Sequence, residues 1–241
     1  SFWIGYGTFN ATNAGTIDVD GKVGLASNSG YNGVVYAPTA GTFYVAATWD
    51  VSQWGGTFYA GSGTVVFDGS SALIYAGTLT NQAFNWLEIN STGTKTLGAA
   101  MNIDGGLRII AGTLATGGQT LYYGAQTWDA SANGGTFNGA GGTITFDRSS
   151  AQSIVSVEKC TFNNVVKSNA ITTLTVGTVV NIGGTFTVNG GTLLQNADLT
   201  CGALVIGSSS LVFVDYTFGG AYSLACTSSG AYSFWVGYGT F

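Results

Sequence analysis

The chain of 241 residues has no histidine, a single proline and few charged side chains. Only 7% of its residues are Asp, Glu, Lys or Arg, against roughly 25% in a typical soluble domain. Without histidine, the usual nucleophile–base pairs of hydrolases cannot form, so we expect no catalytic residues of that kind. The single proline and the irregular spacing of the 39 glycines exclude a collagen-like triple helix.

The few charges also exclude several partners. Binding of nucleic acid needs clustered Lys and Arg, whereas the six basic residues stand one at a time along a chain of net charge −5. No stretch approaches the roughly 18 to 20 apolar residues of a membrane span. A hydrophobic content of 45% opposes disorder. The basic residues are Lys22, Lys95, Arg108, Arg148, Lys159 and Lys167.

What the chain does have is an internal repeat. The segment TWDVSQWGGTF around Trp49 returns 79 residues later as TWDASANGGTF around Trp128. The same interval separates Phe67-Asp68 from Phe146-Asp147. A repeat of this length indicates two copies of one structural module in tandem.

A second, longer repeat joins the two ends of the sequence. SFWIGYGTF at 1–9 returns as SFWVGYGTF at 233–241, with Ile4 replaced by Val236. We expect one period of 232 residues followed by the first residues of the next. The predicted organisation is one continuous rod with a diverged partial module at 1–45, module 1 at 46–124, module 2 at 125–203 and a second diverged partial module at 204–241.

The local pattern predicts an all-β fold. Short apolar runs such as Thr64–Phe67 and Leu73–Tyr75 are bounded by glycine-rich turn formers, and no window keeps a helical period. A module of 79 residues fits three or four coils of roughly 20 to 25 residues, which favours a parallel β-solenoid. The alternative is a tandem pair of antiparallel β-sandwiches.

The repeat itself resembles a known class of protein. GGTFYAGSGTVVFDGSSA, followed by a Phe-Asn strand and a GGL…AGTL segment, resembles the Gly- and Thr-rich parallel β-helix repeats of bacterial and archaeal surface proteins. These include autotransporter passenger regions and filamentous-haemagglutinin-like adhesins, as well as fibre and sheath proteins. The resemblance implies secretion, a rod-like right-handed β-helix, and structural or adhesive work, and it brings no catalytic motif.

The three cysteines leave several alternatives open. Cys160, Cys201 and Cys226 can supply one disulfide and a leftover thiol, a link between subunits, or small buried side chains. No CxxC spacing is present, so neither a zinc site nor a redox motif is predicted.

Acidic residues offer the remaining route to chemistry. A polysaccharide-cleaving enzyme would need paired carboxylates, but Asp68 and Asp147 recur with the module, as expected of turn caps. Asp18-Val19-Asp20-Gly21 resembles the start of a calcium loop, yet Ser29 stands at the closing twelfth position, and a turn is the better account. We therefore expect no metal, no cofactor and no enzymatic activity.

The tryptophans divide by their place in the repeat. Trp49 and Trp128 are equivalent, as are Trp3 and Trp235, which indicates packing for all four. By contrast, Trp54 and Trp86 stand opposite Asn133 and Asn164 in the other copy. These two are the candidates for an exposed contact with glycans.

Together these patterns predict an extracellular structural protein that associates with itself in a fibre, sheath or surface layer. Low charge leaves little repulsion between copies, and a solenoid propagates by stacking at its ends. The junction would be marked by Phe2, Trp3, Tyr6, Phe234, Trp235 and Tyr238. The alternative is an adhesin stalk or phage tail-fibre module that binds surface glycans. A polysaccharide-cleaving enzyme comes third.

Overall fold

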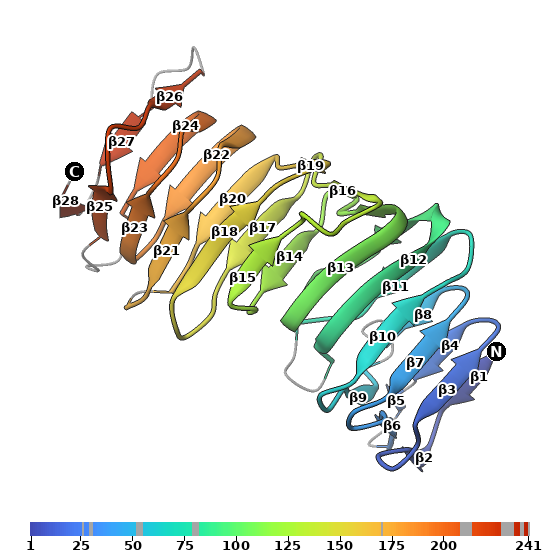
Figure 1. The fold of residues 1–241 in the computed structure, drawn as a ribbon. Coiled ribbons are helices and arrows are strands. Elements are labelled where there is room, and N and C mark those ends of the chain that lie inside the picture. The colour runs from blue at the N-terminus through green and yellow to red at the C-terminus, as the bar shows by residue number, and fades with distance from the viewer. Residues whose placement is uncertain are drawn as a thin grey trace.

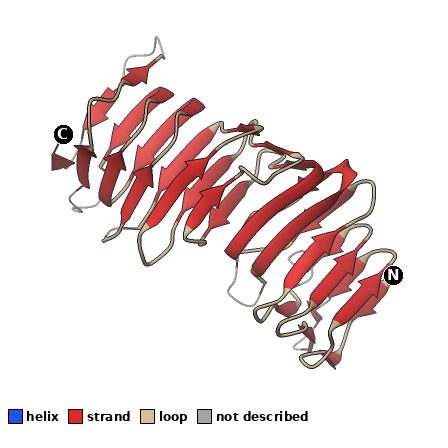
Figure 2. Cartoon of the chain, viewed as in Figure 1, coloured by secondary structure: helices blue, strands red, loops and turns tan. Residues whose placement is uncertain are grey.

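The structure is a computed structural model. It describes residues 1–25, 27–28, 31–51, 55–78, 82–169, 171–207, 214–227, 234–236 and 239–240. Within these residues the chain forms 28 strands and no helix (Figure 2).

In the first half of the chain the strands are β1 (Phe2–Ile4), β2 (Gly7–Asn10), β3 (Thr16–Val19), β4 (Val23–Leu25), β5 (Ser27–Asn28), β6 (Tyr31–Tyr36), β7 (Thr42–Val45), β8 (Trp49–Asp50), β9 (Thr57–Tyr59), β10 (Thr64–Phe67), β11 (Ala72–Tyr75), β12 (Phe84–Leu97), β13 (Met101–Ala115) and β14 (Thr120–Tyr123). In the second half they are β15 (Thr127–Asp129), β16 (Thr136–Asn138), β17 (Thr143–Phe146), β18 (Gln152–Ser156), β19 (Cys160–Thr161), β20 (Asn164–Lys167), β21 (Thr173–Val176), β22 (Val180–Val188), β23 (Gly191–Gln195), β24 (Leu199–Ile206), β25 (Val214–Phe218), β26 (Leu224–Cys226), β27 (Phe234–Val236) and β28 (Gly239–Thr240).

These strands stack as the coils of a parallel β-solenoid of about 9 turns (Figure 1). They form sheets of 18, 6 and 4 strands, and among the described pairings only β5 with β6 is antiparallel. The predicted all-β solenoid is confirmed, and the alternative of antiparallel sandwiches is wrong. Parallel neighbours far apart in sequence cannot be joined by the hairpins that a sandwich needs.

The coil length varies along the rod. The outward positions Thr16, Thr42, Thr64, Trp86 and Gly106 lie side by side in successive coils, at intervals of 26, 22, 22 and 20 residues. The expected length of roughly 20 to 25 residues is close to this range. The differences are taken up at the corners, where turns of different length connect strands of similar register.

One irregular position within β13 shows why glycine is needed where neighbouring coils come close. Gly112 has a φ of 76°, and a Cβ at this position would lie 2.0 Å from the carbonyl oxygen of Ser91. Only glycine adopts this backbone conformation without strain and also lets the two coils approach so closely.

The interior contains two equivalent aromatic clusters among its aliphatic side chains. The ring of Trp49 lies 4.7 Å from that of Phe58, and the ring of Trp128 lies 5.0 Å from that of Phe137. Both tryptophans are buried, so their predicted packing role is confirmed. The clusters consist of Trp49, Phe58, Phe67 and Phe84 in one copy, and of Trp128, Phe137, Phe146 and Phe162 in the other.

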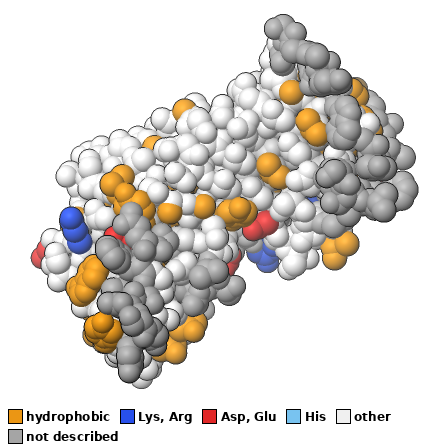
Figure 3. Space-filling view, turned by 180° about the vertical axis from the view of Figure 1, so that it is seen from behind, with side chains coloured by type: hydrophobic (Ala, Val, Ile, Leu, Met, Phe, Trp, Pro, Cys, Tyr) orange, Lys and Arg blue, Asp and Glu red, His pale blue; other side chains and the backbone are white. Residues whose placement is uncertain are grey.

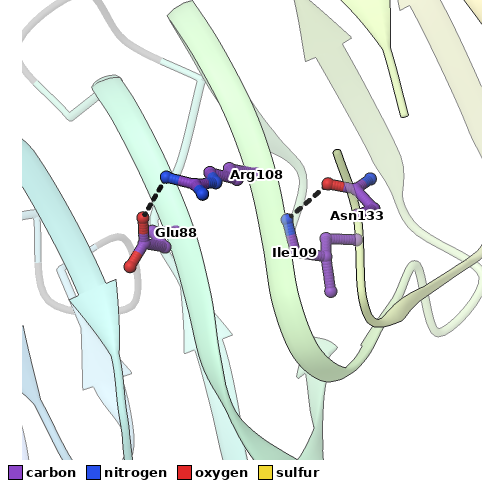
Figure 4. Close-up of polar contacts among 4 residues, drawn as sticks. All are labelled: Glu88, Arg108, Ile109 and Asn133. Atoms are coloured by element: carbon purple, nitrogen blue, oxygen red, sulfur yellow. Dashed lines mark hydrogen bonds and ion pairs between the residues drawn. The ribbon is translucent and has the colours of Figure 1, made fainter. Parts of the chain in front are cut away.

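The two longest strands connect the two halves of the rod. β12 pairs with both β10 and β11, and β13 pairs with both β14 and β16. In Figure 1 they lie where the coils of the first half meet those of the second. Beside β13 the side chain of Asn133 completes the backbone pairing, since the Ile109 N–H donates to Asn133 Oδ1 over 2.9 Å (Figure 4).

Two lysines lie inside the rod, which no sequence pattern indicated. Lys95 and Lys167 are 0% and 1% exposed. Lys95 Nζ donates to the Ser91 hydroxyl over 2.6 Å, and Lys167 Nζ donates to the carbonyl of Asn169. Burial lowers the pKa of both ammonium groups, that of Lys167 to about 8.

Candidate functional site

The first candidate site is the segment that occurs at both ends, which we call the junction segment (residues 1–9 and 233–241). Its N-terminal copy forms β1 and β2, which pair with β4 and β6 in the following coil. Its C-terminal copy contains β27 and β28, which pair with β24 and β25 in the preceding coils. In a stack of parallel strands, the preceding and following neighbours lie on opposite edges. The two copies therefore use opposite edges of the same segment.

The N-terminal copy shows how the side chains of this segment are directed. Phe2 packs against the core, with its ring 5.1 Å from that of Phe9 and 6.1 Å from that of Phe43. Trp3 is 59% exposed, and its ring covers Gly24 in the next coil. The expected packing of Trp3 is thus a contact on the outer surface and not part of the core.

The remaining predicted junction residues differ in their exposure. Tyr6 is 62% exposed and Phe234 is 42% exposed. Of Trp235, only the pairing of its backbone with Val205 is described. Tyr238 lies outside the described residues. The described aromatic side chains of the segment thus include two that pack against the core, Phe2 and Phe9, and three that are open to solvent.

The register between coils determines which cysteines lie next to each other. Cys201 in β24 is the direct partner of Cys226 in β26, and all three thiols are free. Cys160 is instead the partner of Phe137. Burial and the neighbouring Cys226 raise the pKa of Cys201 to about 12, and burial raises the pKa of Cys160 to about 11.

Of the two predicted glycan contacts, Trp54 lies outside the described residues. Trp86 is 44% exposed, and its ring covers Gly106, where a Cβ would lie 2.5 Å from the ring. The outer face next to it carries an ion pair between Arg108 and Glu88, with 3.9 Å between Nη1 and Oε2 (Figure 4). Trp86 is therefore available for an external contact, and its glycan role stays a prediction.

A second candidate site, which the sequence did not indicate, lies on the outside of the rod. Two hollows of about 390 Å³ each share Asp104 as a lining residue. The first is bordered by the stacked rings of Tyr36 and Tyr59. We call this site the outer groove; its lining residues are Tyr36, Tyr59, Ala60, Gly61, Ala83, Asn85, Asp104, Gly124, Asp147, Arg148, Ser149 and Ser150.

Both acidic groups of the outer groove have raised pKa values. Burial raises the pKa of Asp104, and burial together with the charge of Asp104 raises the pKa of Asp147. Because Asp147 recurs as Asp68, its sequence pattern predicted a turn cap and not a site. The signal that was missed is Asp104, whose equivalent in the second copy is Gly183. The pair of carboxyl groups is therefore not a feature of every module.

The turn expected at Asp20-Gly21 follows β3 directly, and the Gly21 N–H donates to the carbonyl of Val19. The described part of the chain holds no group of three His, Cys, Asp or Glu side chains that could bind a metal ion. It also contains no helix long and apolar enough to cross a membrane. In Figure 3 the described part of one face shows mostly backbone and side chains that are neither hydrophobic nor charged, with scattered hydrophobic side chains and few charged ones.

Comparison of the chain with protein-family models, with curated proteins and with solved structures finds no match in any of the three. The resemblance to surface β-helix repeats is therefore supported at the level of the fold, a parallel β-solenoid with Gly- and Thr-rich strands.

Proposed function

We propose that this protein is a structural unit of an extracellular fibre, sheath or surface layer, in which successive units continue one solenoid through the junction segment. The observation that carries the proposal is the use of opposite strand edges by the two copies of that segment. At a junction between two units, a single copy can therefore pair with β24 of one unit and with β4 of the next, in place of the second copy.

The two copies of the junction segment place equivalent residues beside residues of the same kind, inward or outward, in the neighbouring coil. Phe234 is the partner of the buried Leu204, and its equivalent Phe2 is the partner of the buried Val23. On the N-terminal side the next position is outward, because Trp3 lies over Gly24. Since a shift of one residue would turn every side chain to the other face, this agreement supports a continuous core.

The second strand of the segment gives the same result. β28 pairs Gly239 with the buried Val214, and β2 pairs the equivalent Gly7 with the buried Gly33. Both strands of the junction segment are thus compatible with one uninterrupted stack. Each aromatic side chain that the next coil covers would contribute roughly 1.5 to 3 kcal/mol of hydrophobic stabilisation.

The composition supports association, and the resemblance supports an extracellular location. With 7% charged residues, two rods meet with little electrostatic repulsion. Adhesion through glycans is the second candidate, favoured by the exposure of Trp86 on the outer face.

Sedimentation velocity and negative-stain electron microscopy of the purified chain test the main proposal. We expect rods several units long whose length grows with concentration. The synthetic peptide SFWIGYGTF, added in excess, should occupy the junction and shorten the rods, whereas a scrambled peptide of the same composition should not. Particles of single-unit length at every concentration would contradict the proposal.

A further inference from the structure

The outer groove begins at a short stack of aromatic rings. Tyr36 and Tyr59 are partners in neighbouring coils, and their rings lie 4.7 Å apart at an angle of 14°. They are 36% and 42% exposed. Exposed aromatic rings held by the backbone register form a rigid surface that loses little freedom when a ligand packs against it.

Beyond the two tyrosines, the first hollow is lined by small and polar side chains. Ala83 lines the floor of the first hollow, and Asn85 and Asp104 supply polar groups. The hollow is therefore apolar beside the tyrosines and offers hydrogen-bonding groups farther along the rod. Its volume of about 390 Å³ lies within the range of small-molecule sites.

The second hollow continues from Asp104 toward Asp147 and Arg148. The Arg148 guanidinium is held in place, with Nη1 donating to the carbonyl of Gly124 over 3.0 Å and Nε donating to the Ser150 hydroxyl over 2.5 Å. A guanidinium has five N–H groups, so others remain for a ligand. This hollow is lined by fixed polar groups.

Together the hollows follow the axis of the rod over several coils. Tyr36 pairs with Tyr59, and farther along the positions of Ile103, Tyr123 and Phe146 are successive partners. With about 4.8 Å between neighbouring strands, the five steps from the coil of Tyr36 to that of Asp147 span roughly 24 Å. A ligand that fills the groove must therefore be elongated.

We propose that the outer groove binds a neutral polysaccharide chain laid along the rod. Sugar rings present C–H faces that pack on aromatic rings, and their hydroxyl groups both donate and accept hydrogen bonds. Asp104 and Asp147 accept from hydroxyl groups, and Arg148 donates to them. The two carboxylates would repel an anionic polysaccharide, so an uncharged one fits this lining better than an acidic one.

This groove occurs once in the pair of modules. The equivalents of Tyr59 and Asp104 in the second copy are Asn138 and Gly183. The first copy in turn has Gly69 where the second has Arg148. Packing groups recur in both copies, as the aromatic clusters do, whereas these groove residues do not. The outer groove is also separate from the junction segment. The result of a binding test is therefore independent of whether the chain assembles.

Isothermal titration calorimetry of the full chain tests the proposal with cellohexaose, xylohexaose and maltohexaose as neutral probes and hexagalacturonate as the anionic one. We expect at least one neutral hexasaccharide to bind with a Kd below about 1 mM, and hexagalacturonate not to bind. Tyr59→Ala and Asp104→Ala should each weaken that binding roughly tenfold or more. Tyr59→Phe should retain it, because the ring face and not the hydroxyl makes the contact.

The matched control is Asn138→Ala, which changes the position equivalent to Tyr59 in the second copy and should leave affinity unchanged. Thermal unfolding of every variant separates lost binding from lost folding. Failure of all three neutral probes to bind would overturn the proposal. So would equal losses in Asn138→Ala and Tyr59→Ala, or tighter binding of hexagalacturonate than of the neutral probes.

Discussion

Cys201 and Cys226 face each other across neighbouring coils, with 4.0 Å between their Sγ atoms. Directly paired residues of parallel strands have the Cα separation that a disulfide accepts, about 4.4 to 6.8 Å. Cys160 pairs with Phe137 in another part of the stack. Of the alternatives that the sequence left open for its three cysteines, the register therefore favours this one pairing.

Oxidised glutathione should convert the Cys201–Cys226 pair to a disulfide. The two thiols lose two electrons and two protons, and one glutathione disulfide is reduced to two thiols. Because burial and Cys226 raise the pKa of Cys201 to about 12, the reaction should be slow at neutral pH and faster as pH rises. The cross-link should raise the free energy of unfolding by about 3 kcal/mol.

Mass spectrometry after digestion identifies the pair. Cys160→Ser should leave the cross-link intact, and a disulfide that forms in Cys201→Ser would contradict the assignment.

Phe234→Asp should prevent assembly without unfolding the chain. Phe234 is 42% exposed, so a charge there costs little in a single unit but would be buried by the next coil. Sedimentation velocity should show single units at concentrations where the wild type forms rods, with an unchanged melting temperature. Ile171→Asp is the control, because Ile171 is 87% exposed and lies away from the junction segment. Rods of wild-type length in Phe234→Asp would refute the junction.

Lys167 should make stability depend on pH. Its pKa is about 8 in the folded chain and 10.5 as the ordinary value, so the unfolded chain binds more protons between these limits. The free energy of unfolding should therefore rise with pH in this window, by at most about 1.4 kcal/mol per pH unit.

The raised pKa values of Cys160 and Cys201 act in the opposite direction above pH 9, which is why a variant is needed. Urea unfolding at about pH 7.5 and 9.5 should show the wild type gaining stability relative to Lys167→Met. An identical pH dependence in both proteins would show that Lys167 is not the group responsible.

Gly93→Ala should strongly destabilise the rod. A Cβ at Gly93 would lie 1.0 Å from the carbonyl oxygen of Ser70, so the backbone of two coils would have to separate. We expect a loss of about 3 kcal/mol or more in the free energy of unfolding, measured by denaturant titration. Gly15→Ala is the control, since no atom lies within 4 Å of a Cβ there. Equal losses of stability in the two variants would show that the close approach of Ser70 to Gly93 is not the cause.

The aromatic clusters show how far a repeat in sequence predicts a repeat in space. Trp49 and Trp128 stand 79 residues apart, and each packs against the equivalent phenylalanine, Phe58 or Phe137, at about the same distance, 4.7 and 5.0 Å. The packing of the two tryptophans was predictable because both residues lie in strands with the same pattern of inward and outward positions. Glycine-rich turns and the lack of a helical period likewise determined the all-β solenoid.

What only the tertiary structure decided is which residues of different coils meet. Tyr36 and Tyr59 are partners because the coil between them has 23 residues, whereas the coil from Trp86 to Gly106 has 20. The corners absorb these differences, and a change of one residue would turn a side chain from the outside to the interior. Periodicity therefore determined the fold and the core of this chain. The lengths of individual corners set the contacts of the outer groove and the cysteine pair, because they alone fix the register between coils.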